Sequence, residues 1–528
     1  MNPIELGIFS SRIESVCDEM GAMLKRAAFS PNIKDRLDFS CAVFDAQGGL
    51  CAQAAHIPVH LGSMAYAMAD IVSQLDWQPG DMVVLNDPYK GGTHLPDVTL
   101  VAPVFVEDEL LCFVANRAHH ANIGGSSPGS MPISSHLDQE GILIEPSFII
   151  RKGKTDIDIM SALCRKSVQA KGDFSAQISA NLAGVERLAL LIESFTVAAF
   201  KSLVAELNAY GRKLALSSLE SIPNGHYEFE DYLDDDGQGT ERIKIRLTLK
   251  VSNEAQGAGL ADPVGRNNKK VVLDFSGTDQ QVPGNINCPL SVAAAAAFYV
   301  FRCLMPPQTP ACAGTFSAID IQAPKRCLLH AEYPAAVAAG NVETSTRIVD
   351  VVLGALAQAI PDLIPAASHG SMNNVAMGAE AEQDYPRWDY YETIGGGMGA
   401  SAKGDGLSAV QTHMTNTLNT PIESLELHYP LRVTQYGIRQ NSGGKGDYTG
   451  GDGIVREIEF MRPAQVTLLT ERRVLAPWGN NNKVNSDSNG QQGLNLLNGN
   501  PLPGKTTFKT VPGDRLRIET PGGGGYLK

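Results

Sequence analysis

The segment LNDPYKGGTHLPDVTLVAP, residues 85–103, holds a histidine and a carboxylate three residues apart in a turn rich in glycine and proline. These residues are His94 and Asp97, and the pair His119-His120 follows the next apolar run. Imidazole nitrogens and carboxylate oxygens together suit a borderline divalent ion such as zinc, manganese or iron(II). Two histidines with one or two carboxylates leave a coordination position open for water, so the pattern predicts a catalytic metal site.

A β-hairpin over residues 98–120 would bring these groups together. Its two apolar strands flank the acidic turn VEDE, centred near 107–108. Residues on opposite strands whose numbers sum to a constant lie side by side in a hairpin. Asp97 then pairs with His119, and His94 lies just beyond them at the open end of the hairpin.

A second predicted hairpin, over residues 38–56 and centred near 47, places another carboxylate beside a histidine, because Asp38 pairs with His56 by the same rule. The alternative is that each histidine caps a turn and hydrogen-bonds a backbone carbonyl, which explains one histidine but not their convergence. We therefore predict four metal ligands: Asp38, His94, Asp97 and His119.

The neighbouring histidines receive lesser roles. Successive side chains of a strand point to opposite faces, so only one of the tandem pair meets the ion, and the spacing favours His119. His120 is then available for proton transfer, and Asp38 is a second candidate for a catalytic role. In HIPVH, residues 56–60, the proline disrupts a helical ligand pair, so His56 and His60 are at most pocket residues.

The elements that position these residues change character along the chain. Apolar residues recur at helical spacing over 4–29 and again over 155–220, whereas residues 225–281 alternate apolar and polar side chains as strands do. Helices are also predicted at 291–304 and 346–360, and glycine, asparagine and short strands dominate the last third. The sequence predicts a mixed α+β fold, with hairpins and helices in the N-terminal part and β-rich middle and C-terminal parts. The predicted domains cover residues 1–220, 221–365 and 366–528.

Composition argues against several classes of protein. The 528 residues carry a net charge of −14 and no stretch dense in lysine or arginine, which argues against nucleic-acid binding. The longest apolar run, residues 292–301, is about half the length needed to cross a bilayer, and the N-terminus lacks the features of a signal peptide. We therefore expect a cytoplasmic protein without a membrane span. Its nine cysteines are scattered without a CxxC pair, so we expect buried reduced thiols.

The string GNPLPGKT, residues 499–506, matches the phosphate-binding pattern GxxxxGKT literally. A working phosphate loop follows a buried strand and opens a helix whose N-terminal amides bind phosphate. Here two prolines interrupt the loop, and the following residues have the pattern of strand and turn, so we interpret the string as a turn between strands. At GNVETSTR, residues 340–347, helix capping is the default interpretation and anion binding the alternative.

Five strings together resemble the hydantoinase B/oxoprolinase family over essentially the whole chain: DRLDFSCAVFDAQGGLCAQAAHIPVHLGSM, LNDPYKGGTHLPDVTLVAPVF, NRAHHANIGG, GNVETSTR and ETPGGGGY. The resemblance implies a metal held by the histidine and aspartate of GGTHxPD and the first histidine of RAHH, here His94, Asp97 and His119. It makes Asp38, from the DFS motif, a fourth ligand or close neighbour. It also implies a separate or fused actin-like ATPase half that binds ATP, in a heterotetramer of two A and two B subunits.

The expected function follows from this resemblance. The chain is expected to be the metal-bearing catalytic subunit of an ATP-dependent hydrolase that opens a hydantoin, lactam or 5-oxoproline-like ring. Zinc is the first choice of metal, and manganese or iron are the alternatives. One alternative function is a subunit of an ATP-dependent acetone- or acetophenone-type carboxylase. Another is a non-catalytic scaffold for the ATPase subunit, in which the metal stabilises the fold.

Overall fold

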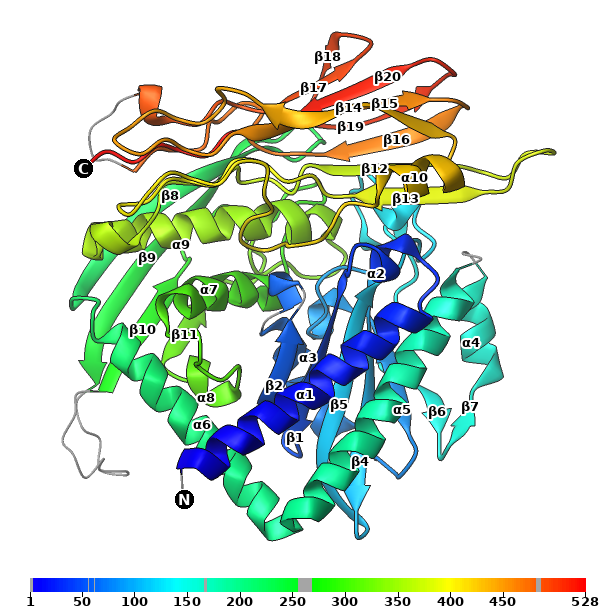
Figure 1. Cartoon of the computed structure of the whole chain (residues 1–528), viewed down its shortest axis with the longest axis vertical. Coiled ribbons are helices and arrows are strands. Elements are labelled where there is room, and N and C mark those ends of the chain that lie inside the picture. The colour runs from blue at the N-terminus through cyan, green and yellow to red at the C-terminus, as the bar shows by residue number, and fades with distance from the viewer. Residues whose placement is uncertain (1–2, 56, 61, 166–168, 255–267, 481–485) are drawn as a thin grey trace.

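The computed structural model describes residues 3–55, 57–60, 62–165, 169–254, 268–480 and 486–528. Within these residues the chain forms four β-sheets that are layered with helices. Two of the sheets belong to the N-terminal and middle parts of the chain, and the other two stack above them in the C-terminal part (Figure 1).

The N-terminal sheet is antiparallel throughout, in the order β2-β1-β5-β4-β3-β6-β7. Its central hairpin consists of β4 and β5, whose side chains are mostly buried on both faces. Burial on both faces explains why these strands have continuous apolar runs in the sequence. The strands are β1 (Phe39–Asp45), β2 (Leu50–Ala55), β3 (Met82–Leu85), β4 (Asp97–Val106), β5 (Glu109–His119), β6 (Ser147–Arg151) and β7 (Lys154–Thr155).

Helices cover both faces of this sheet. α1 (Pro3–Ala27) and α5 (Ala170–Phe195) pack together on one face, and α3 (Ser63–Gln74) packs on the other (Figure 1). The apolar stripe of α1 is buried, as its helical spacing predicts. The remaining helices of this part are α2 (Pro31–Lys34), α4 (Ile157–Cys164) and α6 (Val197–Leu219).

The second sheet has the order β11-β10-β9-β8 and is antiparallel except between β10 and β11. Its strands are β8 (Gly225–Asp235), β9 (Glu241–Glu254), β10 (Asn268–Asp274) and β11 (Ile319–Gln322). Helix α9 (Ser345–Ala359) packs against β8 and β9, and α7 (Leu290–Leu304) packs against α9. A π-helical turn, Gly340–Thr344, leads directly into α9 and brings its residues close to the N-terminal sheet.

Two antiparallel sheets pack face to face in the C-terminal part, in the orders β13-β12-β16-β19 and β14-β15-β20-β17-β18. Apolar residues of both sheets form one buried cluster, with Val375 and Val466 from the first and Ile458 and Leu516 from the second. The elements are β12 (Asn374–Ala379), β13 (Trp388–Glu392), α10 (Ile422–His428), β14 (Leu431–Arg439), β15 (Gly453–Phe460), β16 (Ala464–Leu469), β17 (Leu494–Leu497), β18 (Asn500–Leu502), β19 (Lys505–Thr510) and β20 (Arg515–Glu519).

The structure confirms the mixed fold and the hairpin over 98–120, whose register pairs Asp97 with His119. The first hairpin differs by one residue from its predicted register, because an irregularity between Val43 and Phe44 shifts the pairing towards its open end. His56, the predicted partner of Asp38 there, lies outside the described residues. The division into domains near 220 and 365 stays a prediction.

The interpretation of residues 499–506 as a turn between strands is confirmed. Gly499 lies in the turn between β17 and β18, with a positive φ of 80°, and Lys505 begins β19. The side chain of Lys505 is buried, and its Nζ lies 2.5 Å from a carboxylate oxygen of Glu471. The lysine of the apparent phosphate loop is therefore engaged in an internal ion pair.

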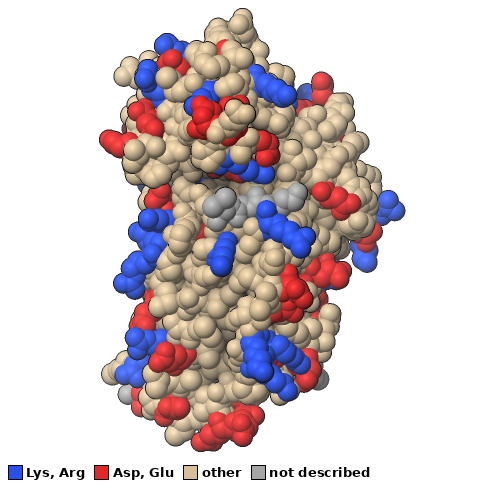
Figure 2. All heavy atoms as spheres, turned by 90° about the vertical axis from the view of Figure 1, so that its right-hand side faces the viewer, with Lys and Arg blue, Asp and Glu red and all other residues tan. Residues whose placement is uncertain are grey.

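The surface and the cysteines add two observations. Figure 2 shows acidic and basic side chains intermingled on one face of the molecule, with a hollow between its upper and lower parts. All nine cysteines are free, and all except Cys164 and Cys303 are buried. Among the described residues, no single helix is both long and apolar enough to cross a membrane, and α5 with α6 meets both conditions only as a pair bent by 102°.

Candidate metal centre

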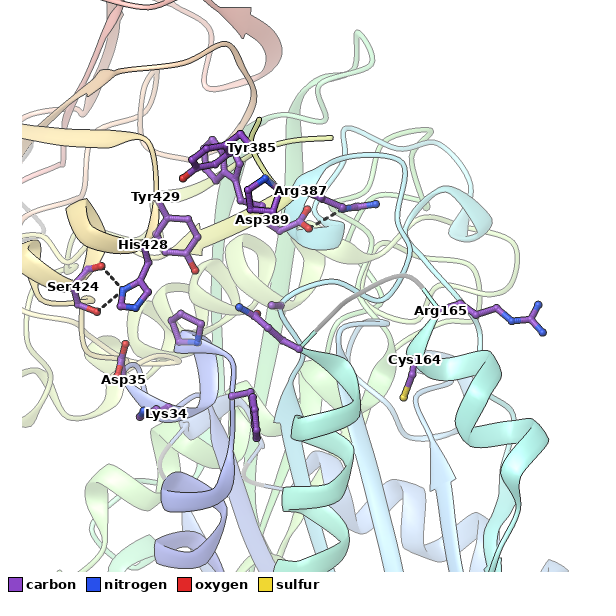
Figure 3. Close-up of a pocket in the computed structure, with 16 residues that line it drawn as sticks. Lys34, Asp35, Cys164, Arg165, Tyr385, Arg387, Asp389, Ser424, His428 and Tyr429 are labelled. Carbon is purple, nitrogen blue, oxygen red and sulfur yellow. Dashed lines mark hydrogen bonds and ion pairs between the residues drawn. The ribbon is translucent and has the colours of Figure 1, made fainter. Parts of the chain in front are cut away.

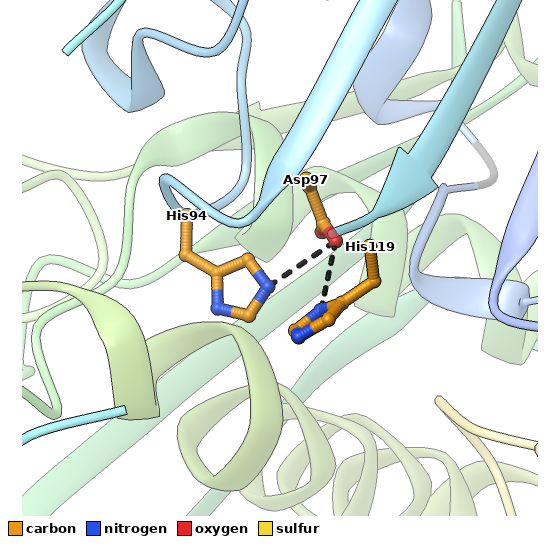
Figure 4. Close-up of side chains that lie close together, drawn as sticks. All are labelled: His94, Asp97 and His119. Atoms are coloured by element: carbon orange, nitrogen blue, oxygen red, sulfur yellow. Dashed lines mark ion pairs between the residues drawn. The ribbon is translucent and has the colours of Figure 1, made fainter. Parts of the chain in front are cut away.

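The hairpin β4-β5 brings together three residues that can bind a metal ion. Asp97 is the first residue of β4 and His119 is the last of β5, and the two are direct partners across the hairpin. His94 lies in the turn before β4 (Figure 4). Its Nε2 is 3.2 Å from Asp97 Oδ1, and His119 Nδ1 is 3.2 Å from the same oxygen. The three side chains are at most 3% exposed and can offer ligand atoms within 4.8 Å of one another.

A third histidine, His60, also faces this carboxylate. Its Nε2 lies 3.4 Å from Asp97 Oδ2, and its Nδ1 lies 3.0 Å from Ser40 Oγ. His60 ends a short 3-10 turn, Pro58–His60. Because this turn is not part of an α-helix, the α-helical spacing of histidines in HIPVH does not decide where His60 lies. The local pattern predicts at most a place in the pocket wall for His60, whereas the structure places it beside the predicted ligands.

Two polar side chains hold the carboxylate of Asp97 in place. Thr93 Oγ1 donates a hydrogen bond to Asp97 Oδ2 at 2.5 Å, and Asn341 Nδ2 donates to the same oxygen at 3.4 Å. Asn341 belongs to the π-helical turn before α9. Such turns are frequent at functional sites. The motif GNVETSTR predicts helix capping, and the hydrogen bond from Asn341 to Asp97 is not part of that prediction.

The loop that carries His94 depends on a close approach between backbones. Gly91 has a φ of 84°, and a Cβ atom there would lie 2.1 Å from the backbone nitrogen of Ala67 in α3. The buried Arg117 donates a hydrogen bond to the carbonyl oxygen of Gly91 at 3.1 Å. Burial lowers the pKa of Arg117 to about 10, so the guanidinium stays charged at neutral pH. The glycine in GGTH therefore positions His94 through its packing against α3.

The ring of His94 is oriented by a backbone carbonyl. Its Nδ1 lies 3.2 Å from the carbonyl oxygen of Ala338. The buried carboxyl of Glu140 accepts hydrogen bonds from the backbone nitrogens of Val337 and Ala338, which fixes that segment. A hydrogen bond from Nδ1 to a carbonyl leaves Nε2 as the unprotonated, metal-binding nitrogen of a neutral histidine.

Burial and charge oppose each other in this cluster. Burial alone would lower the pKa of His94, but the negative charge of the adjacent Asp97 outweighs it, so the pKa is raised. For Asp97, burial acts to raise the pKa, whereas the charge of His94 and the proximity of the other two imidazoles bring it well below its usual value. Asp97 is therefore anionic at neutral pH and can serve as a ligand.

The donor set fits a divalent cation. The Nε2 atoms of His60, His94 and His119 are buried and make no hydrogen bond of acceptable geometry within the described part of the chain. A buried polar atom without a partner costs stability, so three together indicate a missing partner. The cavity they line has a volume of about 20 Å³, which is room for about one water molecule or ion.

Asp38 lines this same cavity, although it lies outside the group of three residues whose ligand atoms meet within 4.8 Å. It arrives beside His119 because β1 pairs with β5, and the backbone nitrogen of His119 donates to the carbonyl oxygen of Asp38 at 3.0 Å. The sequence predicts that the β1-β2 hairpin positions Asp38, whereas in the structure the pairing of β1 with β5 does so. Its role as a fourth ligand stays a prediction.

His120 points elsewhere, as strand alternation predicts. Its Nε2 lies 2.9 Å from Gln177 Oε1, and its ring packs on Phe174 with centroids 4.4 Å apart, both on α5. His120 is not among the described residues that line the cavity. Of the other histidines between 56 and 136, His136 is partly exposed and caps a short 3-10 turn.

The C-terminal part supplies a wall of the cavity that no sequence pattern predicts. The ring of Tyr391, in β13, stacks on His119 with centroids 4.9 Å apart and planes 10° from parallel. Met372, Thr393 and Thr415 line the same cavity. These residues lie more than 250 positions from the hairpin and carry no metal-binding side-chain motif, so only the folded chain reveals them.

Comparisons with known proteins show the family of the chain. The family model of hydantoinase B/oxoprolinase matches residues 2–528. An uncharacterized protein of Methanocaldococcus jannaschii is 38% identical, over 100% of this chain and 91% of its own length. A protein named 5-oxoprolinase 1, from Arabidopsis thaliana, is 37% identical over 99% of this chain, which spans only 42% of that longer protein. The B-type subunit of a putative D-/L-hydantoinase from a Pseudomonas species is 30% identical, over 100% and 90% of the two chains.

Two solved structures share the fold. An ATP-dependent caprolactamase from Pseudomonas jessenii superposes with a TM-score of 0.88 at 24% identity, over 100% of this chain and 91% of that chain. An acetone carboxylase superposes with a TM-score of 0.86 at 16% identity, over 100% and 76%. Together with the match of the family model over nearly every residue, these relatives establish that the chain belongs to the hydantoinase B/oxoprolinase family.

Proposed function

We propose that this chain is the metal-bearing catalytic subunit of an ATP-dependent hydrolase that opens a cyclic amide, such as a hydantoin, a lactam or a 5-oxoproline-like ring. The observation that carries the proposal is the buried convergence of three imidazoles on the Asp97 carboxylate, beside a cavity the size of one ion. Relatives named as a hydantoinase and as a 5-oxoprolinase support the choice of substrate class.

His94, Asp97 and His119 would hold the ion, with His60 or Asp38 as a further ligand. A bound zinc, manganese or iron ion would polarise the amide carbonyl or lower the pKa of a water molecule towards neutrality. Thr93 and Asn341 keep the Asp97 carboxylate in one orientation through their hydrogen bonds to Oδ2. The carbonyl of Ala338 keeps His94 Nε2 directed at the centre.

We assign the proton transfer to a carboxylate oxygen of Asp38 rather than to His120. Asp38 lines the cavity, so it can accept a proton from a water molecule that attacks the ring carbonyl. His120 is held against Gln177 and Phe174 and would need an intervening residue to reach the same water. The role predicted for His120 from the sequence is thereby replaced in this proposal.

ATP would be bound by a partner of the hydantoinase A type. Hydrolysis of an unstrained cyclic amide has little driving force, so phosphorylation of its carbonyl oxygen in the partner would activate it for hydrolysis here, with phosphate as the leaving group. The Pseudomonas relative is named as one subunit of its enzyme, which supports a two-subunit hydrolase. The chain spans about two fifths of the named 5-oxoprolinase, which leaves room for a fused ATPase half. We propose a heterotetramer of two A and two B subunits.

The test is His94→Ala in the complex with its ATPase partner. We expect the variant to lose the bound metal and ring opening, while ATP hydrolysis by the partner persists, because the nucleotide site lies in the other subunit. His136→Ala is the matched control, since His136 is partly exposed and does not line the cavity. Ring opening that survives in His94→Ala, at a rate near that of the unmodified complex, would remove the metal centre from the mechanism.

A carboxylase is the second candidate, supported by the shared fold with acetone carboxylase. The same centre would then stabilise an enolate that attacks activated bicarbonate. Incorporation of labelled bicarbonate into a ketone substrate, without hydrolysis of any cyclic amide, would favour this candidate.

A structural metal is the remaining alternative, because the described centre is fully buried. Chelation separates the two roles. A catalytic ion predicts lost activity in protein that is still folded, whereas a structural ion predicts a lower melting temperature with activity kept by the folded fraction.

A further inference from the structure

The metal centre is closed in this structure, and a cyclic amide cannot fit beside it. The ligand residues are at most 3% exposed, and the cavity that they line holds about one water molecule. A substrate ring therefore has to arrive from a larger neighbouring space.

Such a space lies between the N-terminal and C-terminal parts of the chain. We call it the entrance cavity; it has a volume of about 530 Å³, which is typical of a site for a small molecule. Figure 3 shows Tyr385 and Tyr429 along its upper side, Ser424 at its left and Lys34 with Asp35 along its lower side. Cys164 lines it from the end of α4.

Three chain segments connect the two cavities. In each segment one residue lines the entrance cavity, and another residue two or three positions away lines the metal cavity. Asp389 lines the entrance cavity and Tyr391 the metal cavity, on the same face of β13. Ala121 lines the entrance cavity two residues after His119. Two residues of extended chain span about 7 Å, so the two cavities are neighbours.

The third segment runs from Asp35 to Asp38. Asp35 lines the entrance cavity, Asp38 lines the metal cavity, and the fully buried Arg36 follows Asp35 in the chain. Arg36 Nη1 donates to the carbonyl oxygen of Tyr391 at 2.7 Å, and its guanidinium lies 4.9 Å from the centroid of the Tyr391 ring. Arg36 Nη2 donates to Thr393 Oγ1 at 3.1 Å. Arg36 therefore holds Tyr391 and Thr393, which line the metal cavity.

We propose that the entrance cavity is the binding site through which the activated ring reaches the metal centre. This inference rests on the proposed hydrolase function. The species that arrives is the ring phosphorylated in the partner, whose phosphate oxygens and adjacent ring nitrogen accept hydrogen bonds. The cavity offers aromatic rings together with donors such as Lys34, Arg165 and Tyr429, which match those acceptors.

The experiment fills the entrance cavity without touching the metal centre. Ser424, on α10, lines the cavity and is half-buried, whereas its neighbour Glu423 is exposed and does not line it. In the complex with the ATPase partner, we expect Ser424→Trp to lower kcat/KM for ring opening by about tenfold or more, with bound metal unchanged. The matched control Glu423→Trp should stay within about twofold of the unmodified complex.

A reversible block gives a second measurement if Ser424→Trp folds poorly. Cys164 and Cys303 are the two cysteines that are not buried. In a Cys303→Ser background, a bulky methanethiosulfonate would convert Cys164 to a mixed disulfide and release sulfinate. We expect ring opening to fall by about tenfold or more, to fall less with a methyl reagent, and to return on reduction. Cys164→Ser/Cys303→Ser should be insensitive to the reagent.

The outcomes separate the two proposals. The proposal for the entrance cavity is overturned if kcat/KM stays within about twofold after complete labelling of Cys164 with a bulky group. The same result in a folded Ser424→Trp variant would also overturn it. If His94→Ala also abolishes ring opening in that case, the hydrolase function stands and only the entrance assignment fails. If His94→Ala keeps ring opening, the hydrolase proposal fails whatever the blocked cavity does.

Discussion

Two clusters of buried ionisable side chains lie in this molecule, and they differ in the balance between their basic and acidic groups. The metal-centre cluster consists of His60, His94, Asp97 and His119. The ion-pair cluster, between the second sheet and the C-terminal part, consists of Asp231, Arg347, Asp350, Glu471, Arg472 and Lys505.

In the ion-pair cluster, three cations meet three carboxylates. Arg472 lies 2.7 Å from Asp231 and 2.6 Å from Asp350, and Lys505 lies 2.5 Å from Glu471. In the metal-centre cluster, one carboxylate faces three imidazoles whose Nε2 atoms lack a hydrogen bond of good geometry within the described chain. Burial alone therefore does not distinguish the candidate metal centre from the ion-pair cluster; the surplus of imidazoles over carboxylates does.

The largest expected effect comes from breaking the ion-pair cluster. Lys505→Met removes the cation beside the buried Glu471 and should lower the free energy of unfolding by about 3–5 kcal/mol, because a buried charge loses a partner. Bound metal per folded chain should not change. Denaturant unfolding and elemental analysis measure the two quantities.

Lys509→Met, in the same strand but exposed, is the control and should change stability by about 0.5 kcal/mol at most. A folded Lys505→Met protein that had lost its metal would contradict the separation of the two clusters.

The next effect is a dependence of stability on pH that originates at Glu140, which binds the segment that orients His94. Burial raises the pKa of Glu140 from 4.5 to about 7. Below pH 4.5 the carboxyl of Glu140 is protonated in the folded and in the unfolded chain, and its contribution to stability is fully present. Between pH 4.5 and 7 the carboxyl ionises only in the unfolded chain, so this contribution is lost as the pH rises. The loss amounts to about 3 kcal/mol and is constant above about pH 7.

Glu140→Gln keeps an oxygen acceptor for Val337 and Ala338 but cannot ionise. The free energy of unfolding of this variant, measured by denaturant titration from about pH 4.5 to 8, should therefore fall less than that of the unmodified chain. Equal slopes for the two proteins would show that Glu140 is already ionised in the folded chain.

A smaller effect is expected from the residue that orients Asp97. Asn341→Ala removes the hydrogen bond to Asp97 Oδ2, so we expect metal affinity, measured by competition with a chelator, to fall by about 10–100-fold. Asn208→Ala is the control, because Asn208 bonds Gly314 far from the centre. Unchanged affinity in Asn341→Ala would mean that Thr93 alone holds the carboxylate.

The smallest effect on activity is expected at His120. His120→Gln places an amide where the ring Nε2 meets Gln177, so stability should fall by about 1 kcal/mol and ring opening should stay within about twofold. Steady-state kinetics of the complex with its ATPase partner measure the second quantity. A large loss of ring opening with bound metal intact would restore the proton-transfer role that the sequence suggested.

The sequence by itself determined the core of the candidate centre. A hairpin register follows from the position of its turn, because side chains alternate with a period of two and the buried faces forbid a slip of one residue. The pairing of Asp97 with His119, and the place of His94 beyond them, could therefore be predicted from local spacing alone. The fold class was predictable for the same reason, since helical and strand periodicities are local signals.

Only the tertiary structure decided the rest. His60, Asn341 and Tyr391 reach the centre from a 3-10 turn, a π-helical turn and a strand of the C-terminal sheets, and no local period connects these segments. Asp38 is brought in by the pairing of β1 with β5, and His120 is turned away towards α5. Such contacts depend on how separate layers pack, which is set by the sum of many side-chain contacts across the core rather than by any short stretch of sequence.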